Sequence, residues 1–126
     1  MMLKPKAIAD YLEKHIPYTY YANEFPVNSV DGSAFVRLTG GYPPSEWSPR
    51  KQPSLQVIVR GREEEAVQTE NIADQIYGFL HQKKEFTVGN TSIRRCLADQ
   101  SSPIYVGRDD NDRLLYSINF TLVVMT

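Results

Sequence analysis

The C-terminal part of the chain alternates between apolar and polar residues over an unusual length. Because successive side chains of a strand point to opposite faces, this pattern predicts a half-buried β-strand over 114–124. The strand would be about twice the usual length of ~5–6 residues. We therefore expect it to extend past its own sheet and offer an edge to a neighbouring subunit. Its buried face comprises Leu114, Tyr116, Ile118, Phe120, Leu122 and Val124, and the other face includes Ser117, Asn119 and Thr121.

The rest of the chain contains two helical patterns and several shorter strand patterns. Apolar residues at three- and four-residue steps predict helices over about 5–16 and about 63–83. Alternation and β propensity predict strands over 18–22, 34–39, 54–60, 86–88, 92–98 and 103–106. The order predicts a single α+β domain over 1–126. It has a mainly antiparallel or mixed sheet of about five to six strands, with two helices packed on one face.

Charged residues lie at both ends of the longer predicted helix. Glu63, Glu64 and Glu65 begin it, and Lys83 and Lys84 end it. Carboxylates are favourable at the positive end of the helix dipole, and ammonium groups at the negative end. We therefore interpret the acidic run as the start of a helix, not as a metal site.

The segment 40–53 has the most unusual composition. It contains four prolines and two glycines in fourteen residues, together with the chain's only tryptophan. Long irregular loops in small domains are more often functional than idle. Trp47 lies among prolines with Tyr42, Arg50 and Lys51, which resembles the composition of contact surfaces, where Trp, Tyr and Arg are over-represented. The alternative is that Trp47 folds back over the core and fixes the loop.

The balance of charge narrows the possible partners. The chain has 14 basic and 15 acidic residues and a formal net charge of −1. Proteins that bind nucleic acid usually carry a basic excess, because neutralising phosphates supplies most of their affinity. We therefore expect no specific nucleic-acid binding. No apolar run approaches the ~20 residues that span a bilayer, so we also expect no membrane insertion.

The sequence contains no recognisable catalytic motif, and we expect no enzyme activity, cofactor or metal. His15 and His81 each lie near the end of a predicted helix, where an imidazolium interacts favourably with the dipole. Cys96 lies in a predicted strand, where a small buried thiol is common. A hydrolase would need one of these histidines beside Cys96 and a carboxylate.

The acidic run at 109–112 invites comparison with a calcium loop. Such a loop needs alternate oxygen ligands, a central glycine and a terminal glutamate. Here Asp109, Asp110 and Asp112 are almost consecutive, and the glycine and glutamate are missing. A solvated turn flanked by Arg108 and Arg113 is the favoured interpretation.

Four successive features resemble a known protein family. They are the segment 53–61, which ends in Arg-Gly, the long helix with Ile72 and Ile76, the segment 103–113 with Gly-Arg-Asp-Asp, and Ile-Asn-Phe at 118–120. This succession resembles minor capsid proteins of tailed bacteriophages and prophages. These look like relatives of the tail terminator, or tail-to-head joining, proteins. The likeness covers about residues 50–125.

The resemblance implies a structural virion protein, assembled in the bacterial host cytoplasm. Members of such families form a ring, typically a hexamer, between the tail tube and the head connector. A ring needs two different patches per subunit. The candidate interface residues are Tyr42, Trp47, Arg50, Lys51, Arg108, Asp109, Asp110, Asp112 and Arg113. The alternative function is a small adaptor domain that binds a protein or peptide through the Trp47 loop.

Overall fold

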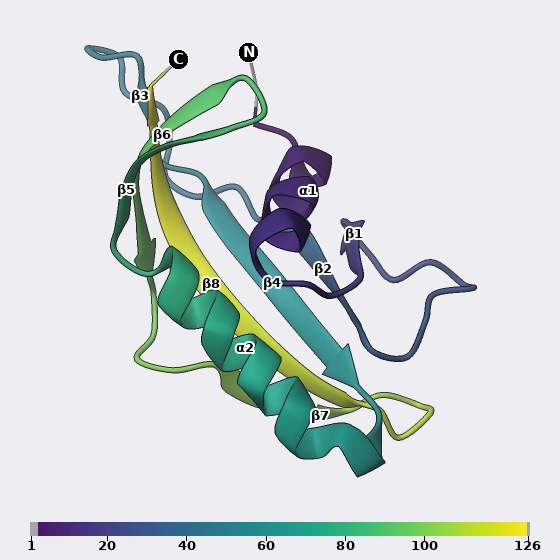
Figure 1. Ribbon diagram of the computed structural model, residues 1–126. Helices are drawn as coiled ribbons and strands as arrows, with labels where there is room; N and C mark the ends of the chain where they lie inside the picture. Colours follow the sequence, from purple (N-terminus) through teal and green to yellow (C-terminus); the bar gives the residue numbers. More distant parts are fainter. Residues whose placement is uncertain (1–2, 126) are drawn as a thin grey trace.

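The computed structural model describes residues 3–125 and contains two α-helices and eight strands in that range. In Figure 1 the helices lie against one curled sheet. The elements, in chain order, are α1 (Pro5–His15), β1 (Tyr20–Ala22), β2 (Ser33–Leu38), β3 (Arg50–Lys51), β4 (Ser54–Gly61), a short 3₁₀ turn (Glu63–Glu65), α2 (Ala66–Leu80), β5 (Lys83–Val88), β6 (Thr91–Ala98), β7 (Ile104–Arg108) and β8 (Leu114–Met125).

The sheet has the order β1-β2-β4-β8-β6-β5, and β3 and β7 also pair with β8. Strand β1 runs parallel to β2, and every other pair is antiparallel. The predicted α+β class with a mixed sheet is confirmed. The strand count is higher than the expected five to six. One reason is that the two-residue β3 exists only through its pairing with the distant end of β8.

Both edges of β8 are paired within the subunit, so the expectation that this strand offers a free edge is wrong. On one side it pairs with β4 over 114–121 and with β3 at 124–125. On the other side it pairs with β7 over 114–117 and with β6 over 120–124. The strand is long because it lies at the centre of the sheet and pairs with four neighbouring strands.

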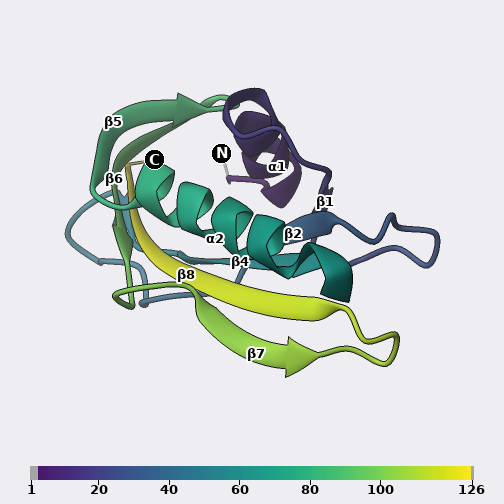
Figure 2. The same cartoon turned by 60° about the horizontal axis from the view of Figure 1, so that its bottom comes forward.

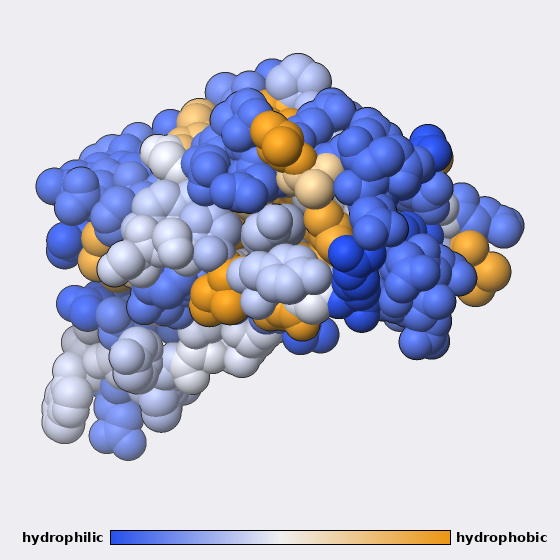
Figure 3. All heavy atoms as spheres, turned by 90° about the horizontal axis from the view of Figure 1, so that it is seen from below, coloured by the Kyte–Doolittle hydropathy of each residue, from blue (hydrophilic) through white to orange (hydrophobic). Residues whose placement is uncertain are grey.

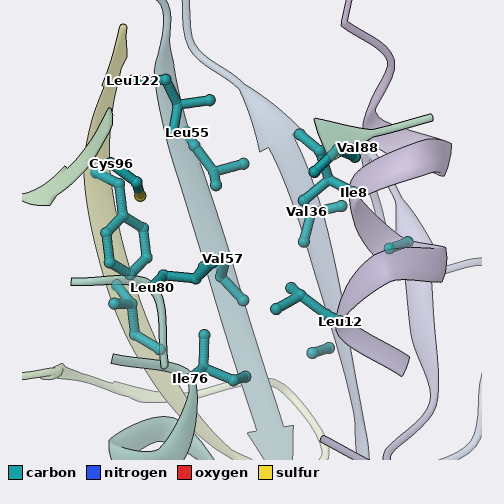
Figure 4. Packing of buried hydrophobic residues seen from close by; sticks show 14 of the residues in the cluster. Ile8, Leu12, Val36, Leu55, Val57, Ile76, Leu80, Val88, Cys96 and Leu122 are labelled. Atoms are coloured by element: carbon teal, nitrogen blue, oxygen red, sulfur yellow. The ribbon is translucent and has the colours of Figure 1, made fainter. Parts of the chain in front are cut away.

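Both helices pack on the same face of the sheet and share one core. Figure 2 shows α1 and α2 side by side within the curl of the sheet. In Figure 4, side chains from both helices point toward the sheet. The alternation of β8 is confirmed from Ile118 to Val124, where Ile118, Phe120, Leu122 and Val124 are buried. Nearer the start of the strand Leu114 is buried as predicted, but Tyr116 is only partly buried, and Ser117, predicted on the other face, is buried. Core residues shown in Figure 4 include Ile8, Leu12, Val36, Leu55, Val57, Ile76, Leu80, Val88, Cys96 and Leu122.

The second helix is shorter than the sequence pattern indicates. It ends at Leu80, because His81 has an extended backbone and Gln82 a positive φ of 62°. Lys83 and Lys84 therefore begin β5, and the expectation that they match the helix dipole is wrong. The acidic residues 63–65 do precede the helix, as a 3₁₀ turn.

Arg60 fixes the loop between β1 and β2 to the sheet. Its side chain is only 3% exposed and lies over the Phe25 ring, with Cζ 3.8 Å from the ring centroid. The guanidinium donates hydrogen bonds to the carbonyl oxygens of Asp31 and Val30 and to the hydroxyls of Ser29 and Ser33. Arg60, part of the Arg-Gly pair that contributes to the family resemblance, therefore stabilises the fold.

Candidate functional site

Residues 40–53, called here the proline loop, project from the sheet beside the C-terminal end of β8 (Figure 1). Trp47 is 93% exposed, so the alternative that it packs over the core is wrong. Tyr42 is also largely exposed. The loop therefore presents aromatic side chains to solvent, as a contact surface would.

The base of the proline loop is held in place although its tip is irregular. Arg50 and Lys51 form β3, opposite Met125 and Val124. The backbone N–H of Tyr42 donates to the Gln52 carbonyl oxygen at 3.1 Å. Gly41 has a φ of +94°, and a Cβ atom there would overlap the backbone of residues 52–54. The loop thus leaves the sheet in a defined direction.

Residues 108–113, called here the acidic turn, lie at the other end of β8. Asp109 holds the turn closed by accepting hydrogen bonds from the backbone N–H groups of Asn111 and Arg113, both at 3.0 Å. It also accepts from Arg113 Nε at 2.8 Å. Burial opposes ionisation of Asp109, but these donors outweigh it and lower the pKa of the carboxyl group.

The other charged residues of the acidic turn divide into paired and unpaired groups. Arg113 bridges Asp109 and Asp31, at 2.8 and 3.1 Å, and Arg108 contacts Glu63 at 3.0 Å. In the described part of the chain, Asp110 and Asp112 are exposed and form no ion pair. A polar depression of about 290 Å³ lies beside them, lined by Asp31, Arg62, Glu63, Glu64, Asn111, Asp112 and Arg113.

Strand β7 carries an apolar surface that is not among the interface residues predicted from the sequence. Ile104, Tyr105 and Val106, called here the β7 ledge, are each about half exposed. The Tyr105 ring lies 5.4 Å from that of Tyr116, centroid to centroid. The segment was correctly predicted as a strand. Its side chains are exposed because the strand lies at an edge of the sheet, and a local sequence pattern does not indicate that position. Figure 3, viewed from below, shows apolar patches within a largely hydrophilic surface.

The cysteine and the two histidines lie in environments typical of residues that stabilise a fold. Cys96 is fully buried, and burial raises the pKa of its thiol to about 12. His81 Nδ1 accepts a hydrogen bond from the Ala98 backbone N–H at 3.1 Å, and His15 Nδ1 donates to the Tyr11 carbonyl oxygen at 2.9 Å. Across residues 3–125, no group of His, Cys, Asp and Glu side chains is arranged to hold a metal ion.

The identity of the chain follows from a match over nearly its whole length. Residues 4–126 match the family model described as bacteriophage tail terminator protein. The chain belongs to this tail terminator family. It is therefore a phage structural tail protein, from a family that is structural and not enzymatic.

Comparison with solved structures supports the fold of this member of the tail terminator family. Nine chains of known structure match it. One of them has a TM-score of 0.59 and 13% sequence identity, over 96% of this chain and 89% of that chain. At such low identity the likeness concerns the fold alone. No curated protein matches the sequence. Neither helix of the described residues is long and apolar enough to cross a membrane.

Proposed function

We propose that this tail terminator assembles as a ring, typically of six copies, between the tail tube and the head connector. Family membership supports a structural role in the phage tail. The observation that supports the ring is that the proline loop and the acidic turn lie at opposite ends of β8. A ring requires two different patches on each subunit, because its contacts are heterologous.

The proposed partners are other copies of the chain, the tail tube protein and the head connector protein. Assembly takes place in the cytoplasm of the bacterial host, and the mature ring belongs to the virion. The genome passes through the ring without being held. The formal net charge of −1 suits such a pore, since a strongly basic lumen would bind phosphate.

Deleting the gene from its phage tests the proposed function. A terminator stops tube growth, so phage without it should produce tails of irregular, extended length that do not join heads. Electron microscopy gives the length distribution, and wild-type protein supplied from a plasmid should restore uniform tails. Normal-length tails joined to heads in the deletion phage would rule out termination.

The alternative is an adaptor that binds one protein or peptide through the proline loop, and exposed Trp47 suits this role too. The two functions predict different consequences of a change in the loop. Under the adaptor hypothesis, substituting Trp47 and Arg50 removes one binary interaction and leaves particles intact. Under the ring proposal the same substitutions impair tail completion.

A further inference from the structure

We propose that the proline loop of one subunit docks on the β7 ledge and the acidic turn of the next subunit. This inference rests on the proposed ring and specifies its subunit contact. Both surfaces present apolar side chains to solvent: Tyr42 and Trp47 on one, and Ile104, Tyr105 and Val106 on the other. Exposed apolar groups gathered on a small protein mark contact sites.

The unpaired charges at the base of the proline loop and those of the acidic turn have opposite sign, and the loop also carries one exposed acidic residue, Glu46, beside Trp47. Arg50 and Lys51 at the base of the proline loop are exposed, and within residues 3–125 their side chains form no ion pair. Asp110 and Asp112 are the unpaired members of the acidic turn. Oppositely charged patches steer association and fix the relative position of the partners.

The two surfaces cannot meet within one subunit. Arg50 and Lys51 pair with residues 125 and 124, whereas the acidic turn directly precedes Leu114. The twelve residues of β8 extend roughly 40 Å along the strand at about 3.4 Å per residue. The complementary surface must therefore belong to another molecule, and a second copy of this chain supplies it.

The backbone at the ledge also suits an extended partner. Within residues 3–125, β7 pairs with β8 alone, so its outer edge is left for a segment without regular structure. The proline loop is such a segment. The edge strand β5, by contrast, carries Lys83, Lys84 and Glu85, charges that discourage strand addition. The outer edges of β7 and β5 therefore differ in what they can bind.

Charge reversal with rescue tests this contact. We expect Arg50→Glu with Lys51→Glu to weaken self-association about tenfold, and Asp110→Lys with Asp112→Lys to do the same. Combining all four substitutions should restore association to within about threefold of wild type. Sedimentation velocity measures association in solution, and electron microscopy measures tail completion when each variant complements the deletion phage. Circular dichroism checks that each variant is folded.

Matched controls separate the docking contact from general effects of charge. Lys84→Glu with Arg95→Glu changes the net charge equally but lies on the β5–β6 side, where both side chains are exposed and, within residues 3–125, form no ion pair, so it should leave assembly unchanged. Trp47→Ala should reduce association, whereas Val27→Ala, another fully exposed apolar residue, should not. The proposed contact is wrong if each of the two charge-reversed variants assembles like wild type, or if the variant with all four substitutions stays defective. Neither result would contradict the proposed role in tail termination. Normal tails without the protein would instead contradict the proposed function.

Discussion

Thr69 of α2 packs directly against Gly61 at the end of β4, so closely that a Cβ atom on Gly61 would overlap the threonine hydroxyl. Thr69 is itself buried, and its hydroxyl donates to the Glu65 carbonyl oxygen at 2.9 Å. Gly61, the glycine of the Arg-Gly pair that contributes to the family resemblance, therefore allows α2 to pack closely against the sheet.

Gly61→Ala should destabilise the protein by about 3 kcal/mol, because the added methyl group must displace α2. Chemical denaturation measures this loss. Gly78→Ala is the matched control, since Gly78 lies in the same helix and a Cβ there meets nothing within 4 Å. That change should stabilise the protein by about 0.8 kcal/mol through higher helix propensity. Equal effects of the two substitutions would contradict this packing.

Arg60→Ala should cost about 3 kcal/mol of unfolding free energy, because it removes four hydrogen bonds to partly or fully buried acceptors together with the contact to the Phe25 ring. Amide hydrogen exchange should also increase across residues 23–33, the loop that the guanidinium holds. Arg37→Ala is the control. That arginine, on the neighbouring strand, is exposed and makes one side-chain hydrogen bond, to Gln56, so its loss should cost less than about 1 kcal/mol. An unchanged exchange rate in the Arg60 variant would rule out this role.

Asp109→Asn should destabilise the acidic turn by about 2 kcal/mol near neutral pH, since charge-assisted hydrogen bonds are lost. The folded state lowers the pKa of Asp109 below the ordinary 3.8. Its contribution to stability is therefore present above pH 3.8 and is lost as the pH falls through the lower folded value. Urea titrations from pH 7 to pH 2 should show the wild type and variant converging in acid. Asp110→Asn, on an exposed and unpaired residue, should change stability by less than about 0.5 kcal/mol.

Cys96 should react with a thiol reagent at pH 8 at least about a thousandfold more slowly than an exposed cysteine, because it must first be uncovered. Cys96→Ala combined with Ser92→Cys places a thiol at an exposed position of the same strand and should react at once. The raised thiol pKa, about 12 against the ordinary 9.0, contributes stability below pH 9 that is lost as the pH rises toward 12. Rapid labelling of folded wild-type protein would show that Cys96 is accessible.

Local patterns predicted much of this fold correctly. The spacing of Ile8 and Leu12, and of Ile72 and Ile76, indicated helices that pack on a sheet. Alternation in β4 and β8 identified the strands that form its centre. These predictions succeeded because each depends on which face of one element is apolar, and that is written in neighbouring residues.

The candidate interface was predicted less completely, because two residues of the same type can have different environments in the folded chain. Asp109 and Asp110 are adjacent in sequence, yet the first is held by Arg113, and the second forms no ion pair with any residue from 3 to 125. The exposure of Trp47 and the location of the β7 ledge depended on what packs nearby. Whether the unpaired residues form an interface stays a prediction for the charge-reversal experiment.

By itself, the sequence determined the α+β class, the two amphipathic helices, the half-buried β8 and the resemblance to tail terminators. Only the tertiary structure decided that β8 has no free edge, that Arg60 is buried beneath a loop, and that the proline loop and acidic turn lie at opposite ends of one strand. The reason is physical. Periodicity is set by local side-chain chemistry, whereas edges, burial and ion pairs arise from contacts between segments far apart in the chain.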